Sequence, residues 1–445
     1  MMNRKSLASI ATALLALGST AWAADSSSVG NQASSAGSPA LISPTALVPQ
    51  PIFADDATPP SPPLMMGLEK LGIGKQLESW NVSIGGYAEV GYMYDMTVPR
   101  DRTPAKLAPG DALNFNGAYK NSFDPDQFDL AIQKTVDATK GKWDWGFDIE
   151  GIYGRDATYF HSNGIYDNTT KNHADGGGGF AQPDLEQAYF DVAIPVGGGI
   201  LVKGGKFVTL IGNEVINPTG NAFYTHSYTF SYGEPLTNTG LIGTYYFNST
   251  WNATAGITRG WNQSTIDNNG DPDFIGQVAY AGDKLTAYFN LETGPGDTSL
   301  VAKDNTNNVF LPNIVAAYKV SDQLTVTGEG LWGYYNALTQ WYGLVGYASY
   351  TFSSQLTFNL RGEWYEDANG FTTGSAVVHP GCTNFYEITA GTKITPMPND
   401  AILKNLSFRP ELRFDLADHS VLDPNGAGVG HPNEVTASID AVMVY

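Results

Sequence analysis

Ionisable side chains alternate with apolar ones along many segments of this chain. In residues 406–414, arginine occupies positions 409 and 413 and glutamate 411, while leucine or phenylalanine occupies 406, 408, 412 and 414. Residues two apart lie on the same face of a β-strand, so this spacing gathers charge on one face and apolar surface on the other. A face so rich in charge is costly to bury without water or partners. The charged set comprises Glu89, Asp129, Asp148, Glu150, Asp191, Glu292, Glu329, Arg361, Glu363, Glu387, Arg409, Glu411, Arg413 and Asp440.

The basic members of this set are clustered. Arg361 belongs to one predicted strand, and Arg409 and Arg413 belong to the next strand but one. Two interpretations are open. The arginines could face a wall of carboxylates and create a transverse field that favours polar, oriented solutes. Alternatively, they could pair with Glu363 and Glu411 and simply hold the wall together.

Residue types that could support catalysis are present, but without a diagnostic spacing. The six histidines, at positions 161, 173, 226, 379, 419 and 431, all fall in predicted loops. The glycine-rich stretch from Asp175 to Gly179 is not followed by a predicted helix, so it is no phosphate-binding loop. The neighbourhood of Cys382 lacks the ligand spacing of a zinc site. We therefore predict no catalytic residue, no metal site and no cofactor.

The N-terminal region and the charge indicate the compartment. Arg4 and Lys5 precede an apolar run from Leu7 to Leu17, and Ala21-Trp22-Ala23 forms a small-residue cleavage site, so residues 1–23 read as a secretory signal cleaved near Ala23. Residues 24–79 read as a flexible periplasmic leader rich in Ser, Ala and Pro, with one short helix near 64–77. The net charge of −20 argues against nucleic acid as a partner.

Residues 80–445 divide into period-two segments, which we count as sixteen strands, with a range of 14–18. Their connections alternate between short and long. The short ones fall at 137–142, 195–199, 248–250, 282–283, 321–322, 353–354 and 395–403; the long ones fall at 95–126, 155–183, 208–237, 262–273, 293–308, 333–340, 366–383 and 415–432. Short periplasmic turns, long external loops and an even strand number are typical of transmembrane β-barrels. The pattern predicts an all-β fold, an antiparallel up-and-down barrel in the bacterial outer membrane.

Two further features agree with a barrel. The last strand alternates up to a terminal aromatic, Tyr445, as in the closing strand that the barrel-assembly machinery binds. Trp143 and Trp145 follow a short turn, and Trp332, Trp341 and Trp364 lie near long loops, which predicts two interfacial aromatic girdles.

The connection 208–237 is aromatic and nearly free of Lys and Asp, which favours folding inward against the wall. Glu214, His226 and Glu234 would then border a constriction. A loop packed across the external mouth is the alternative.

Residues 204–240 resemble the family described as "putative beta-barrel porin-2", the outer-membrane-protein-L-like porins. The resemblance rests on Gly204–Phe207, Gly212–Glu214, Asn217, Asn221, His226-Ser227, Pro235-Leu236 and Thr239-Gly240. The segments 84–92 and 182–189 are similar too, and the resemblance spans about 80–445.

This resemblance implies an outer-membrane porin, and it transfers no binding residues. Sixteen strands with a charged inner face independently predict a water-filled barrel that passes small hydrophilic solutes or ions. The acidic excess mildly favours cations. The alternatives are a barrel-embedded hydrolase (phospholipase or protease) and a non-conducting surface or adhesive barrel. Expected partners are membrane lipid and small solutes, and the sequence leaves open whether three copies assemble.

Overall fold

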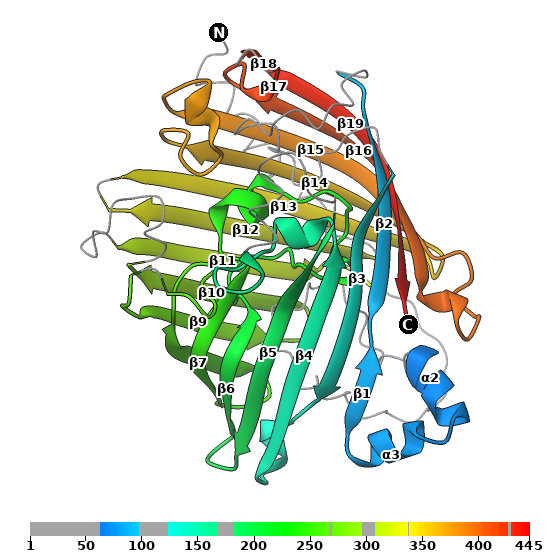
Figure 1. Ribbon diagram of the computed structural model, residues 1–445. Helices are drawn as coiled ribbons and strands as arrows, with labels where there is room; N and C mark the ends of the chain where they lie inside the picture. Colours follow the sequence, from blue (N-terminus) through cyan, green and yellow to red (C-terminus); the bar gives the residue numbers. More distant parts are fainter. Residues whose placement is uncertain are drawn as a thin grey trace, which may run out of the picture. The chain divides into compact units, whose positions relative to one another are not determined.

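Sixteen antiparallel strands close into a ring in the computed structural model, which describes residues 63–97, 123–167, 181–267, 269–295, 308–336, 338–425 and 429–445 (Figure 1). The predicted signal (1–23) and most of the leader lie outside these residues. The barrel strands are β2 (Tyr87–Asp95), β3 (Phe123–Lys134), β4 (Asp144–Gly154), β5 (Gln182–Ile194), β6 (Ile200–Val208), β7 (Thr237–Tyr246), β8 (Trp251–Thr258), β9 (Asp273–Ala281), β10 (Leu285–Gly294), β11 (Val309–Lys319), β12 (Leu324–Tyr335), β13 (Thr339–Ser353), β14 (Leu356–Asp367), β15 (Thr383–Ile394), β16 (Leu406–Ala417) and β19 (Asn433–Val444).

Each strand pairs with its neighbours in the chain, and the ring closes where β19 pairs with β2. Beyond the end of β19, the backbone N–H of Tyr445 donates to the carbonyl of Gly86 (2.8 Å), and that of Gly86 donates back to Tyr445 (3.0 Å). The predicted barrel of sixteen strands is confirmed. None of the helices in the described residues is long and apolar enough to cross a membrane.

The two faces of the barrel differ as the alternation predicts. On β14, Phe358 and Leu360 point outward and are about two-fifths exposed, whereas Arg361 is fully buried and Glu363 nearly so. An apolar exterior of this kind suits contact with acyl chains, and the polar groups are collected inside.

The first predicted strand and the predicted helix are each interrupted. Residues 80–92 form β1 (Val82–Gly85) and β2, which pair with successive parts of β3 on either side of Gly86. The single helix expected near 64–77 is two helices, α2 (Pro63–Lys70) and α3 (Gly74–Ser79). Gly72 lies between them at φ +85°, a left-handed conformation that ends α2 and that glycine adopts without strain.

The connections contain short elements that the alternation did not predict. A two-stranded hairpin, β17 (Leu422–Asn425) and β18 (Val429–His431), lies in the connection between β16 and β19. Among the residues that the structure describes, five 3₁₀ turns occur at Ala138–Lys140, Asp156–Thr158, Pro218–Gly220, Ser375–Val377 and Leu403–Asn405, and one π-helical turn, η5, spans Thr229–Gly233.

Trp341 does not belong to the external girdle that the sequence predicts. Trp143, Trp145 and Trp332 are 67%, 50% and 39% exposed on the outer face, but Trp341 is 3% exposed. Its odd position on β13 turns it inward, since Thr339, Trp341 and the odd positions that follow are the buried face of that strand. The prediction for Trp341 was therefore wrong.

Candidate functional site: the inner wall and the docked segment

All fourteen charged residues expected on the inner face are buried there, and each is at most 8% exposed. Between β6 and β7, residues 209–236 lie against this inner wall, and we call them the docked segment. Most of its side chains are buried. The candidate site is the contact between the docked segment and the wall formed by β13, β14, β15, β16 and β19.

Three wall arginines hold the docked segment by its backbone carbonyls. Arg409 Nη1 donates to the carbonyl oxygens of Pro218 (2.7 Å) and Asn221 (2.9 Å). Arg361 Nη1 donates to the carbonyl of Thr225 at 2.7 Å. Arg413 Nη1 donates to that of His226, at 2.5 Å. A guanidinium has five N–H donors in a fixed plane, so each arginine can bind the segment and a wall carboxylate at once.

The remaining guanidinium donors bind acids of the wall. Arg361 Nε donates to Glu387 Oε2 (3.0 Å). Arg409 binds Asp440 and Glu89, and Arg413 binds Asp415 through two parallel N–H···O bonds of 2.7 and 2.9 Å. All three arginines are buried and neutralised by these partners. The interpretation in which they pair with Glu363 and Glu411 is therefore wrong in its partners.

Glu363 and Glu411 instead bind N–H groups of the docked segment. Glu363 accepts from the backbone N–H of Tyr228 and Thr229, both at 2.7 Å, and Glu411 accepts from that of Tyr224 at 2.8 Å. Hydrogen bonds to a charged acceptor are stronger than neutral ones. The wall thus satisfies both the donors and the acceptors of a backbone that has no ladder of its own, as a buried segment requires.

Glu214 connects the segment to the wall. Its Oε1 accepts from Arg361 Nη1 (2.8 Å) and from the Tyr347 hydroxyl (3.1 Å). Its Oε2 lies 2.9 Å from His226 Nδ1 and accepts from the Ser227 N–H at 3.0 Å. Burial alone would raise the pKa of Glu214, but the Arg361 guanidinium and His226 outweigh it and lower the pKa to about 2. Glu214 is therefore a fixed negative charge in the middle of the contact.

Glu234 has the opposite environment. Its side chain lies over Gly212, whose φ of +87° and lack of a Cβ leave room for the carboxylate. Burial raises the pKa of Glu234 well above its usual range, and the neighbouring carboxylates Glu329, Glu214 and Glu363 raise it further. Glu234 therefore prefers its neutral, protonated form.

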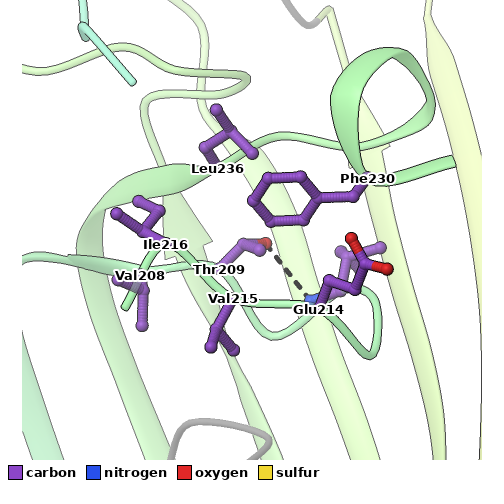
Figure 2. A pocket seen from close by; sticks show the side chains of 8 residues that line it. Val208, Thr209, Glu214, Val215, Ile216, Phe230 and Leu236 are labelled. Atoms are coloured by element: carbon purple, nitrogen blue, oxygen red, sulfur yellow. Dashed lines mark hydrogen bonds between the residues drawn. The ribbon is translucent and has the colours of Figure 1, made fainter. Parts of the chain in front are cut away.

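Aromatic packing completes the contact. The ring of His226 stacks on Phe230 with 4.2 Å between centroids, and Trp341 Nε1 donates to the carbonyl of Gly233 at 2.9 Å. Phe230 and Leu236 close over the end of β6, where a pocket of about 10 Å³ has room for about one water molecule (Figure 2). Packing at this place is tight, so the segment is held by apolar contact as well as by charge.

The alternation of polar and apolar residues did not predict the inner-face acids at two β-bulges. The register between β2 and β3 slips at Asp126, and that between β4 and β5 slips at Glu186. Each slip puts two consecutive residues inside, Asp126 with Gln127 and Glu186 with Gln187. A bulge changes the phase of the alternation, so even-numbered Glu186 appears to belong to the outer face of Phe190. The acidic residue inside an otherwise apolar set was the signal that could have revealed it.

The fold and the site define a transmembrane β-barrel of porin type with a segment docked inside. The chain belongs to the family "Putative beta-barrel porin-2, OmpL-like", whose model matches residues 81–444. Among solved structures, it is similar to OmpF of Salmonella typhi in complex with daunomycin: the identity is 11%, the TM-score 0.55, and the alignment covers 83% of this chain and 99% of that one. An anion-selective porin from Comamonas acidovorans has 13% identity and a TM-score of 0.51, covering 82% and 99%. At these identities, the likeness concerns the fold. A search of curated proteins found no match.

Proposed function

We propose that this protein is an outer-membrane porin that allows passive diffusion of small hydrophilic solutes or ions. The observation that carries the proposal is the closed ring of sixteen strands with an apolar exterior and ionisable groups inside. A ring of about eight strands fills its interior with side chains, whereas sixteen leave an aqueous channel. The fourteen inner-wall residues, each at most 8% exposed, would then surround the bore and set its electric field.

The docked segment would act as the constriction. It occupies one side of the inner wall, and Glu214, His226 and Glu234 lie in its buried part. We therefore expect a conductance below that of an open sixteen-stranded barrel. Eleven of the fourteen inner-wall residues are acidic, and the three arginines are neutralised by acids, so the bore should prefer cations.

We propose a channel rather than a barrel-embedded hydrolase. A hydrolase would require a histidine that is held by an acid and free to serve a nucleophile. The pair His226–Glu214 has the right distance, but Glu214 also binds Arg361 and Tyr347, and His226 is stacked on Phe230. These contacts are those of a structural anchor.

Location and assembly follow from the same proposal. The predicted signal would deliver the chain to the periplasm, and the closing strand up to Tyr445 would be the part that the barrel-assembly machinery engages. A homotrimer in membrane lipid is an arrangement that the exposed outer face allows.

Reconstitution into planar lipid bilayers tests the function. The folded protein should give discrete conductance steps. In a salt gradient, its reversal potential should have the sign expected for a channel that prefers cations. Heat-unfolded protein at the same concentration is the control. A barrel that is folded by gel mobility yet silent in the bilayer would contradict the porin and favour a non-conducting surface barrel.

A further inference from the structure

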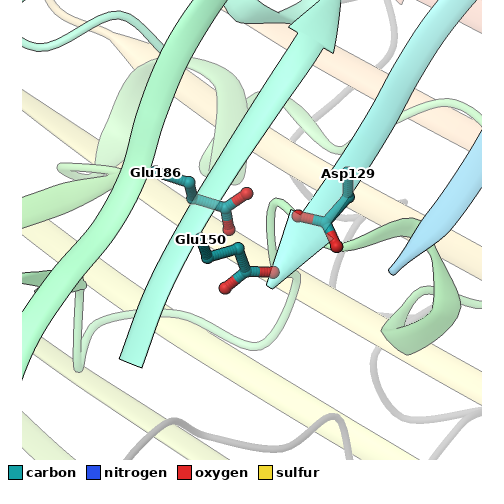
Figure 3. A group of neighbouring side chains, drawn as sticks. All are labelled: Asp129, Glu150 and Glu186. Carbon is teal, nitrogen blue, oxygen red and sulfur yellow. The ribbon is translucent and has the colours of Figure 1, made fainter. Parts of the chain in front are cut away.

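Three buried carboxylates converge on the inner face of adjacent strands. Asp129 of β3, Glu150 of β4 and Glu186 of β5 each present one oxygen, and these oxygens lie within 4.8 Å of one another. The side chains point toward a common space (Figure 3). Their exposed fractions are 2%, 7% and 2%, so water does little to screen their mutual repulsion.

The bulge in β5 is what assembles the group. Glu150 is opposite Gln187 and Gly151 is opposite Leu185, so Glu186 is the extra residue, turned inward beside Gln187. Gln187 Nε2 donates to Glu150 Oε2 at 2.6 Å and orients that carboxylate. Bulges recur where a strand must re-aim a side chain at a functional place.

The basic side chains nearby are used by other acids. The ion pairs of this part of the wall join Arg155 to Asp126 (2.9 Å), Lys206 to Asp184 (3.7 Å) and Lys203 to Asp191 (3.8 Å). Within the described ranges, no lysine, arginine or histidine lies within 4.0 Å of the three converging carboxylates. The group therefore carries up to three negative charges with no protein cation of the described residues in direct contact, and Lys206, which attracts Glu186, is already paired with Asp184.

Two oxygens of the group also have no hydrogen-bond donor. Asp129 Oδ2 and Glu186 Oε2 are both buried without a partner among the described residues. Buried polar atoms are almost always satisfied, and an exception points to an ion, a water or a proton that fills the place.

We propose that Asp129, Glu150 and Glu186 bind a calcium ion. Carboxylate oxygens are the ligands of hard divalent cations, and calcium takes them at 2.3–2.6 Å in irregular geometries completed by water. Two oxygens bound to one such ion are at most about 5 Å apart, and each of the three carboxylates has an oxygen within 4.8 Å of the other two, so one ion can reach all three. The ion would tie β3, β4 and β5 together next to the closing seam, where the Tyr445 hydroxyl donates to the carbonyl of Asp129. This role does not depend on conduction.

Calcium titration of the folded full-length protein tests the site. The protein is refolded in a neutral detergent, stripped with EDTA and titrated by calorimetry at neutral pH, and thermal unfolding is followed by tryptophan fluorescence. We expect saturable binding of one ion per chain and a midpoint of unfolding several degrees higher in calcium than in EDTA. Asp129→Asn and Glu186→Gln should each weaken binding at least tenfold.

Asp191→Asn is the matched control, because Asp191 is also buried on β5 but pairs with Lys203. It should keep calcium affinity within a fewfold of wild type. Absence of saturable calcium binding to wild type, or identical unfolding in calcium and EDTA, would mean that protons balance the carboxylates and would overturn the proposal. Undiminished binding by the folded Glu186→Gln variant would do the same. If the variants do not fold, the wild-type titration alone decides.

Discussion

Replacing Glu214 with glutamine should release the docked segment. Glutamine keeps the shape of the side chain but has one oxygen acceptor, whereas Glu214 accepts with both oxygens from Arg361 and Tyr347 on one side and from Ser227 on the other. Whichever way the amide of glutamine is turned, its NH₂ group lies against N–H or O–H groups that also donate. The variant therefore loses the charge and also leaves buried donors unpaired.

The size of the effect follows from the depressed pKa. A drop from 4.5 to about 2 corresponds to about 3 kcal/mol of interaction that favours the ionised form. If the docked segment alone absorbed this loss, its opening equilibrium would shift by roughly 10²-fold. The sign agrees with linkage: this contribution is present above pH 4.5 and is lost as the pH falls through the folded value of about 2.

Hydrogen–deuterium exchange of residues 209–236 measures the opening without requiring conduction. The amides of Ser227, Tyr228 and Thr229, which donate to carboxylates, should exchange roughly 10²-fold faster in Glu214→Gln, while the strand amides are unchanged. Glu366→Gln, the same change at an even, outward position of β14, is the control. Equal protection of the docked segment in wild type and variant would refute the anchoring role of Glu214.

Three other variants test the contact. Glu234→Gln should weaken a pH response. Because the folded pKa of Glu234 is raised, docking is strongest below pH 4.5 and weakens as the pH rises through the raised value. Wild-type channels should therefore fluctuate more as the pH is raised from 4.5, and the variant should show a smaller increase. Arg409→Glu with Arg413→Glu reverses two charges that bind loop carbonyls, and should raise both cation preference and single-channel conductance in bilayers; an unchanged reversal potential would contradict it. Trp341→Phe removes an indole donor and should destabilise docking by about 1 kcal/mol in exchange measurements, whereas Trp332→Phe on the outer face should not.

Strand number, the outer and inner faces and most of the inner acids were readable from the sequence. Alternation is a local property with a period of two, so Phe358, Leu360, Arg361 and Glu363 each reveal their face from immediate neighbours alone. The unusual composition of residues 208–237 likewise marked the connection that differs from the others.

Only the tertiary structure determined which residues contact one another. Arg409 binds carbonyls about 190 positions earlier in the chain, and Glu363 and Glu411 each accept from backbone N–H groups, which carry no side-chain signature, as well as from threonine hydroxyls. The bulge at Glu186 is a feature of the register between β4 and β5, and the sequence of β5 gives only one sign of it, an acidic residue in an apolar set. Local periodicity determined which residues face inward. The docking of residues 209–236 against strands distant in the sequence determined which groups those inward-facing residues bind.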